Sequence, residues 1–409
     1  MHSLLVDILY PHTPFVSSFS LHLYITSHKQ SPLDKQSPLD MFLSRPATTF
    51  LQSSSLQCSS LRNLSSYPFP FQPTPELAAV VTKIQDQQSS LLQSWGFNRK
   101  TVTLSTGEKL GYLEKNTHGD IGGDLGESRE PKATLLMLHG MTQDASLFAP
   151  FAASLRLPPS IRVLIPDAQG HGSRIDHAVG MGEDFYGWSG DERAVDAGHF
   201  LDAIEQNDKV DVYGYSMGGG TALSLAAHHP ERVGKTLLLS PGLGLTQEAI
   251  DEQQAGVIRY NYTTIEEAIL MMETVGFHPE VAKLRAPLLL ASRAQSGVDG
   301  EYWAKMWAGT ANGTVGIGLT IVEAMMEQCT EKAALAKSFD KEMKVIQGSK
   351  DRVIHEDVPF SVQKGMGGED SCKVVIIDGY GHAGSPENPD GYIAGPAARP
   401  AAEFFKYSK

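Results

Sequence analysis

The sequence predicts an α/β fold, in which helices cover both faces of a doubly wound, mostly parallel sheet. Short and almost continuous apolar runs recur along the chain, as at 133–140, 161–167 and 210–213. Segments with helical periodicity separate them, such as 191–205, where apolar side chains fall on one stripe. Strands that are apolar on both sides are typical of a parallel sheet buried between two helical layers, so this alternation indicates the fold class.

Residues 76–244 are expected to form the first part of the core. Its first two strands, 100–104 and 110–114, are joined by a Thr-Gly turn, and a polar, Gly-rich loop follows them. The next strands run into a glycine or a Pro-Asp pair, which are residues that end strands. The elements that follow are strands at 133–140 and 161–167, a helix at 191–205, a strand at 210–213, a helix from 219, and a strand at 235–240.

The alternation stops after Gly244. Residues 245–337 are helical in character, which predicts an inserted helical cap after the sixth strand. Residues 338–409 are expected to complete the core, with strands at 343–347 and 373–377 and a last helix at 396–407.

Residues 1–75 are expected to form a disordered or targeting extension. They are rich in Ser, Leu, Pro and Gln, and the hexapeptide 29–34 is repeated at 35–40. From 41 to 71 the chain carries arginine but no acidic residue, as organellar transit peptides do. An upstream extension with Met41 as the true start is the alternative. We therefore expect a cytoplasmic or a mitochondrial protein.

Composition narrows the classes of function. The chain has 409 residues, 41% of them apolar, and a formal net charge of −13. Such an acidic chain gives no electrostatic reason to expect nucleic acid as a partner. Three cysteines, far apart in the sequence, suit a reducing compartment. No C-x-x-C or H-E-x-x-H spacing occurs, so we expect neither a metal nor another cofactor.

The pentapeptide Gly214-Tyr215-Ser216-Met217-Gly218 is the most informative motif of the chain. It lies between an apolar strand and a helix, so its serine stands at the apex of a sharp turn. Glycine two residues to either side removes the Cβ atoms that would prevent strand and helix from approaching closely. This context predicts that Ser216 is a catalytic nucleophile.

A serine nucleophile needs a base that a third group orients. Asp351 follows the strand at 343–347, and His382 follows the strand at 373–377. The carboxyl ends of parallel strands meet at one edge of a sheet, so we expect Asp351 and His382 to join Ser216 there. The competing residues are Asp378, expected to be a turn residue, His355, expected in a solvated loop, and His171, expected to shape the loop after its strand.

An oxyanion hole requires two preorganised N–H donors. Met217, directly after the nucleophile, is predicted to supply one of them. The loop after Leu138-His139-Gly140 is predicted to supply the other, through the N–H of Met141. An ordinary strand-ending turn is the alternative interpretation of His139-Gly140.

Taken together, these motifs resemble the α/β-hydrolase superfamily, in the order His139-Gly140-Met141, Asp167-x-x-Gly170-His171-Gly172, the Ser216 pentapeptide, Gly348-Ser349-Lys350-Asp351 and Gly381-His382. The resemblance covers about Thr101 to the C-terminus. It implies an eight-stranded sheet, a helical cap and hydrolysis through an acyl-enzyme. Within the superfamily the chain looks most like the monoacylglycerol-lipase-like esterases.

The cap is expected to line an apolar pocket with Trp303, Trp307, Met325 and Met326, although packing of the cap on the core would explain the same residues. We therefore predict a serine hydrolase of carboxylic esters, such as monoacylglycerols, whose partner is a small-molecule ester and whose peripheral contact with membranes is left open. A carbon–carbon bond hydrolase and a proline-iminopeptidase-like peptidase are the alternatives. A receptor or scaffold without catalytic activity is a third alternative.

Overall fold

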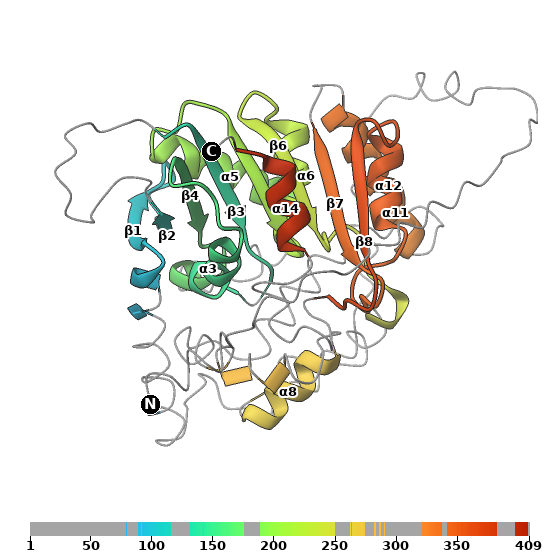
Figure 1. Cartoon of the computed structure of the whole chain (residues 1–409), viewed down its shortest axis with the longest axis horizontal. Helices are drawn as coiled ribbons and strands as arrows, with labels where there is room; N and C mark the ends of the chain where they lie inside the picture. The colour runs from blue at the N-terminus through green and yellow to red at the C-terminus, as the bar shows by residue number, and fades with distance from the viewer. Residues whose placement is uncertain are drawn as a thin grey trace, which may run out of the picture. The chain divides into compact units, whose positions relative to one another are not determined.

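The strands of the chain assemble into one eight-stranded sheet in the order β1-β2-β4-β3-β5-β6-β7-β8 (Figure 1). This computed structural model describes residues 92–115, 131–141, 143–175, 189–249, 264–274, 321–337, 342–382 and 397–407, together with residues 79, 89, 90, 262, 282, 283, 286, 287 and 290. All of these residues belong to one compact unit, Arg62–Lys409. The predicted mostly parallel, eight-stranded sheet is confirmed.

The elements follow the sequence pattern closely. The strands are β1 (Phe97–Thr103), β2 (Lys109–Lys115), β3 (Ala133–Leu138), β4 (Ile161–Pro166), β5 (Val210–Tyr215), β6 (Val233–Leu239), β7 (Met343–Gly348) and β8 (Cys372–Ile377). The helices are α3 (Ala145–Ser154), α5 (Gly190–Ala203), α6 (Met217–His228), α8 (Ile265–Thr274), α11 (Ile321–Lys337), α12 (Val358–Gly365) and α14 (Ala398–Phe405), and Gly172–Arg174 form a 3-10 turn.

The topology places the sequence motifs at one edge of the sheet. β1 and β2 form an antiparallel hairpin, β2 pairs antiparallel with β4, and the other neighbours pair in parallel. The chain order reverses around β3, which lies between β4 and β5. In such sheets a crevice for ligands forms at the carboxyl ends of the strands flanking the reversal. Leu138 of β3 is in register with Gly214 of β5, so the loops after these two strands leave the sheet side by side.

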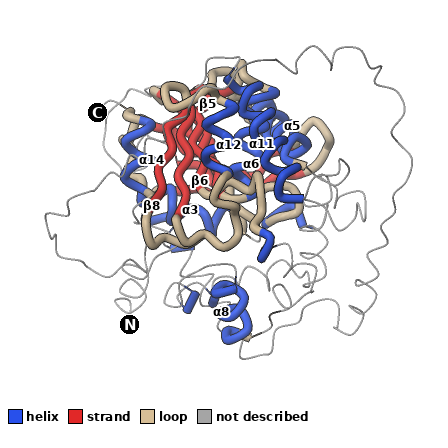
Figure 2. The backbone as a smooth tube through the Cα atoms, turned by 90° about the vertical axis from the view of Figure 1, so that its right-hand side faces the viewer, coloured by secondary structure: helices blue, strands red, loops and turns tan. Residues whose placement is uncertain are grey.

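Helices form a layer on each face of the sheet. Helices α3 and α14 cover one face, and α5, α6, α11 and α12 cover the other (Figures 1 and 2). Alternate residues of β5 supply both layers, because side chains of a strand alternate between its faces. Val212 belongs to the cluster beneath α6, whereas Tyr213 packs against Phe151 of α3 and Phe405 of α14.

Helix α11 differs from the sequence-based division, which assigned it to the cap. Its Cys329, Ala333 and Ala336 are buried in the core cluster. It also lies close to α12, because a Cβ atom on Gly365 of α12 would lie 2.2 Å from the carbonyl oxygen of Thr330 in α11. Small side chains on one face allow this close approach to the core helices. In the structure α11, which ends at Lys337, therefore lies in the helical layer of the sheet (Figure 2).

The described residues of the predicted cap segment include α8 and a separate apolar cluster that contains Tyr262, Met271 and Met272. The predicted extension 1–75 and the predicted pocket residues Trp303 and Trp307 lie outside the described residues, as do the side chains of Met325 and Met326. Among the residues that the structure describes, no helix has the length and apolar character needed to cross a membrane. The same residues contain no cluster of His, Cys, Asp and Glu suited to a metal ion.

Glycines let α6 pack directly on the backbone of β3. A Cβ atom on Gly218 would lie 2.2 Å from the carbonyl oxygen of Leu138, and one on Gly214 would lie 2.3 Å from the carbonyl oxygen of Gly218. Backbone atoms cannot rotate away as flexible side chains can. Glycine at these two positions is therefore a requirement of the tertiary fold.

We expect Gly218→Ala to lower the free energy of unfolding by about 1–3 kcal/mol, because the added methyl overpacks against backbone. Chemical denaturation of purified protein measures this change. Gly198→Ala is the matched control, since Gly198 lies inside α5, where an added Cβ atom would meet no neighbour within 4 Å. That control should gain about 0.5–1 kcal/mol from helix propensity. Equal stabilities of the two variants would contradict the packing argument.

Candidate functional site

Ser216 occupies a strained backbone conformation between β5 and α6. Its φ is 52° and its ψ is −119°, a backbone conformation that residues other than glycine rarely adopt. Hydrogen bonds hold the strain: the N–H of Ser216 donates to Leu239 O at 3.0 Å, and its carbonyl accepts from Gly219 N at 2.8 Å and Gly242 N at 2.6 Å. The turn is thus fixed by the helix that follows it and by the loop after β6.

A chain of hydrogen bonds joins Ser216 to His382 and Asp351. His382 Nε2 lies 3.2 Å from Ser216 Oγ, and Nδ1 lies 3.0 Å from the nearer oxygen of Asp351. Because a carboxylate only accepts, Nδ1 carries the proton and Nε2 is free to accept the proton of the serine. The side chains of His382 and Asp351 are 7% and 1% exposed, so the hydrogen bond between them is shielded from water. The structure thus brings together the three residues that the sequence predicts as a triad.

The loops after β7 and β8 hold Asp351 and His382 in place. Asp351 Oδ1 accepts from the N–H groups of Val353 and Ile354, each at 3.0 Å. Lys350 N donates to Tyr380 O at 2.9 Å, which ties the two loops together. A Cβ atom on Gly348 would lie 2.0 Å from that same carbonyl oxygen, so glycine is required where β7 ends.

The competing residues contact other groups. His355 Nδ1 accepts from Asp357 N at 3.2 Å, and its side chain is 28% exposed. Asp378 is exposed and accepts from Ser349 Oγ at 2.9 Å, as a turn residue does. His171 is buried with its ring 5.2 Å from that of His139. These positions agree with the structural roles expected from the sequence.

The two predicted oxyanion donors lie on backbone next to Ser216. Met217 is the first residue of α6, so its N–H has no acceptor within the helix. Gly140 borders the serine, because a Cβ atom there would lie 3.2 Å from Ser216 Cβ. The carbonyl of Gly140 accepts from His139 Nδ1 at 2.8 Å and from Gln143 N at 3.3 Å. In a planar trans peptide this directs the N–H of Met141 the opposite way.

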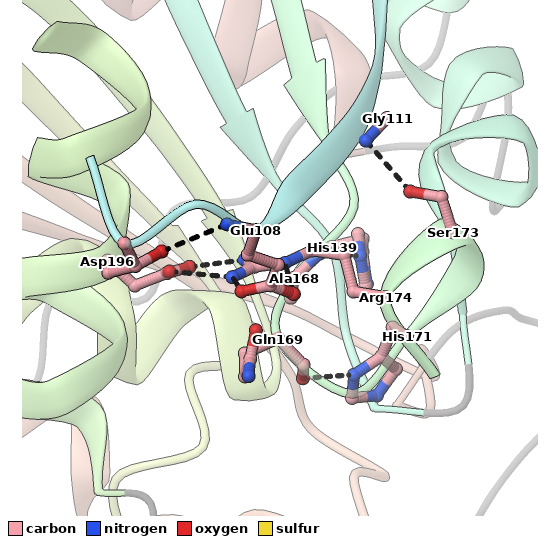
Figure 3. A network of polar contacts seen from close by, with 10 residues as sticks. Glu108, Gly111, His139, Ala168, Gln169, His171, Ser173, Arg174 and Asp196 are labelled. Carbon is pink, nitrogen blue, oxygen red and sulfur yellow. Dashed lines mark hydrogen bonds and ion pairs between the residues drawn. The ribbon is translucent and has the colours of Figure 1, made fainter. Parts of the chain in front are cut away.

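His139 is held as a neutral imidazole. Ala168 N donates to its Nε2 at 3.0 Å (Figure 3). The ring proton must therefore lie on Nδ1, which is 2.8 Å from the Gly140 carbonyl oxygen. Burial lowers the pKa of His139 and of the neighbouring His171, which removes a positive charge from beneath the site. The loop after β4 thus sets the orientation of the loop after β3.

The sequence analysis predicted no role for two buried residues near the site. Asp167, at the end of β4, is fully buried and accepts from Ala145 N at 2.9 Å and from Ser173 N at 3.0 Å. It therefore joins the start of α3 to the loop after β4. A Cβ atom on Gly172 would lie 2.5 Å from the carboxyl carbon of Asp167. The glycine that ends the Asp-x-x-Gly-His-Gly motif is therefore the feature of the sequence that indicates this buried carboxylate.

Arg174 is the other residue, and it is fully buried between two carboxylates (Figure 3). It forms paired hydrogen bonds with Glu108 at 2.6–2.9 Å and with Asp196 at 2.5–2.8 Å. These bonds link the hairpin turn, the loop after β4 and α5. Nothing local marks Arg174 in the sequence, since its partners are 66 and 22 residues away.

Comparison with known proteins identifies the family. Residues 129–388 match the family Hydrolase_4, described as serine aminopeptidase, S33. This stretch is more than half of the chain, and it contains Ser216, Asp351 and His382. The chain belongs to this family.

A relative in Pseudomonas putida, 2-hydroxy-6-oxononadienedioate/2-hydroxy-6-oxononatrienedioate hydrolase 1, is 29% identical over 194 residues. That similarity covers 45% of this chain and 64% of the relative, so the chain spans less than two thirds of the length of the curated relative that it matches.

Two solved structures share the fold. A bacterial membrane phospholipase A has a TM-score of 0.56 and 17% identity, covering 81% of this chain and 91% of its own. A lipase-like protein of Acinetobacter baumannii AYE has a TM-score of 0.55 and 18% identity, covering 80% and 94%.

The neutral histidines lead to a prediction about pH and stability. In the unfolded chain His139 and His171 regain an ordinary pKa near 6.5, whereas in the folded protein it is lower. Below about pH 6.5 the unfolded state therefore binds more protons, and the free energy of unfolding falls as pH falls. The slope from each histidine is at most about 1.4 kcal/mol per pH unit.

Urea denaturation between pH 7.5 and pH 5.5 measures this slope. His171→Gln removes one titrating group, so the variant should lose stability less steeply than the wild type over the same interval. The same slope in both proteins would show that His171 does not contribute.

Proposed function

We propose that this chain hydrolyses carboxylic esters through an acyl-enzyme, with Ser216 as the nucleophile. The observation that carries the proposal is the unbroken path of hydrogen bonds from Asp351 through His382 to Ser216 Oγ. A serine at a strained turn, with an oriented base within hydrogen-bond reach, has the geometry that nucleophilic catalysis requires.

In the proposed reaction, Ser216 Oγ attacks the ester carbonyl and His382 Nε2 takes its proton. Asp351 accepts from Nδ1 and stabilises the imidazolium that forms. The N–H groups of Met217 and Met141 donate to the developing oxyanion. His382 then protonates the leaving alcohol, and a water molecule activated by the same imidazole releases the acid.

The proposed substrate is a monoacylglycerol or another uncharged ester with an apolar acyl group. The net charge of −13 disfavours anionic substrates, and the predicted cap segment is rich in Trp and Met. Such a substrate comes from a lipid surface, so we propose peripheral contact with membranes rather than residence in them.

Carbon–carbon bond hydrolysis is the second candidate, and the Pseudomonas putida relative is named as a hydrolase of 2-hydroxy-6-oxononadienedioate and 2-hydroxy-6-oxononatrienedioate. The name denotes a dicarboxylate, which needs cationic side chains in the substrate pocket. The family description favours a third candidate, an aminopeptidase, which needs a carboxylate for the α-amino group of its substrate. These requirements distinguish the candidates, since an uncharged ester needs neither partner.

Replacement of the nucleophile tests the proposal. Ser216→Ala should lower the turnover of a short p-nitrophenyl ester by several orders of magnitude and abolish labelling by a fluorophosphonate. The thermal unfolding temperature should change little, since the hydroxyl carries no packing. Near-wild-type turnover in this variant would show that another residue is the nucleophile.

Two histidine variants provide the matched control for the base. His382→Ala should lose about as much turnover as Ser216→Ala, because the two residues act as a unit. His355→Ala should retain turnover, since His355 contacts the loop around Asp357. The reverse result would overturn the assignment of the base.

Acyl-chain length tests the substrate class. Each buried methylene contributes about 0.8 kcal/mol, so kcat/KM should rise with acyl length until the pocket is filled and then fall. A series of p-nitrophenyl esters and monoacylglycerols of graded length measures this profile. Preference for a 2-hydroxy-6-oxo-dienedioate or for an aminoacyl anilide would replace the ester proposal with one of the other candidates.

A further inference from the structure

Tyr215 is the last residue of β5, directly before the proposed nucleophile, and it also contacts the proposed base. Its hydroxyl donates to the backbone carbonyl of His382 at 3.3 Å, and its ring centroid lies 5.3 Å from that of the imidazole. Tyr215 is 2% exposed, so this contact is made away from bulk water. One buried side chain thus reaches the residue proposed as base from the residue next to the nucleophile.

We infer that Tyr215 is a positioning residue, which holds His382 at the distance from Ser216 that proton transfer requires. The inference rests on the proposed function, because it assigns His382 as the base. Asp351 restrains the imidazole at Nδ1, whereas Tyr215 restrains the backbone that carries the ring. With both ends restrained, Nε2 cannot swing away from Ser216 Oγ. A misplacement of catalytic groups by about 1 Å can cost about 100-fold in rate.

The ring of Tyr215 is itself fixed by neighbours that do not belong to the proposed triad. It stacks on Phe148 of α3, with ring centroids 6.1 Å apart and planes inclined by 18°. On another side it meets Gly140, where a Cβ atom would lie 3.0 Å from two of its ring carbons. Tyr215 therefore contacts both the loop that carries Met141 and the loop that carries His382.

Tyr213 provides a matched control for this inference. It lies two residues earlier on the same strand, so its side chain leaves the same face of the sheet. It is also fully buried and packs on the same helix, with ring contacts to Phe148 and Phe151. Removing its hydroxyl imposes a comparable change on the core without touching the backbone of His382.

Tyr215→Phe tests the inference, because it removes the hydrogen bond to His382 and keeps the ring. We expect kcat for a p-nitrophenyl ester to fall about threefold to tenfold, with KM and the unfolding temperature close to wild type. The rate constant for labelling by a fluorophosphonate should fall by the same factor, since it depends on the same proton transfer. Tyr213→Phe should leave kcat and the labelling rate unchanged.

The outcomes separate this inference from the proposed function. A wild-type protein that neither hydrolyses esters nor reacts with the fluorophosphonate would contradict the proposed function itself. If the wild type is active and Tyr215→Phe has the same kcat and the same labelling rate as the wild type, only the positioning role is overturned. Equal losses in Tyr215→Phe and Tyr213→Phe would also overturn it, because they would trace the effect to general packing of the aromatic core.

Discussion

The direct packing of α6 on the backbone of β3 is the constraint on which the rest of the site depends. Gly218 faces the carbonyl of Leu138 at a distance that no Cβ atom could occupy. This contact places the start of α6, with the N–H of Met217, beside the loop that carries Met141. It also forces the chain through the strained conformation of Ser216, which hydrogen bonds with β6, α6 and the loop after β6 then hold. Geometry at the nucleophile is therefore a consequence of how closely one helix meets one strand.

Beneath this contact, buried polar groups connect the loops that the sheet brings together. Asp167 accepts hydrogen bonds from the start of α3 and from the 3-10 turn. Neutral His139 joins the loop after β3 to the loop after β4 through Ala168 (Figure 3). Arg174 connects the 3-10 turn to the β1–β2 hairpin turn through Glu108 and to α5 through Asp196. Buried charges and imidazoles require partners, so such a network has few alternative arrangements. Rigidity of this kind is what preorganised donors to an oxyanion require.

The proposed base is held from the opposite direction by the second half of the core. Asp351 and His382 lie on loops after the last two strands, and these loops are tied to each other through Lys350 and Tyr380. Tyr215 joins them to the first half of the core through the carbonyl of His382. The described contacts that hold Asp351 and His382 therefore lie at the ends of β5, β7 and β8 and in the loops that follow them.

The sequence by itself determined the strands, the order of the site residues and the turn at Ser216, because apolar periodicity and glycine spacing are local properties. It also predicted Ser216, Asp351 and His382 as partners, since the carboxyl ends of parallel strands share one edge. Tertiary structure alone decided the role of α11, whose small residues pack on the core helices, and the pairing of Arg174 with Glu108 and Asp196. The contact between Tyr215 and His382 was decided in the same way. Such pairings join residues far apart in the chain, and no local period or motif encodes which distant group will lie opposite a given side chain.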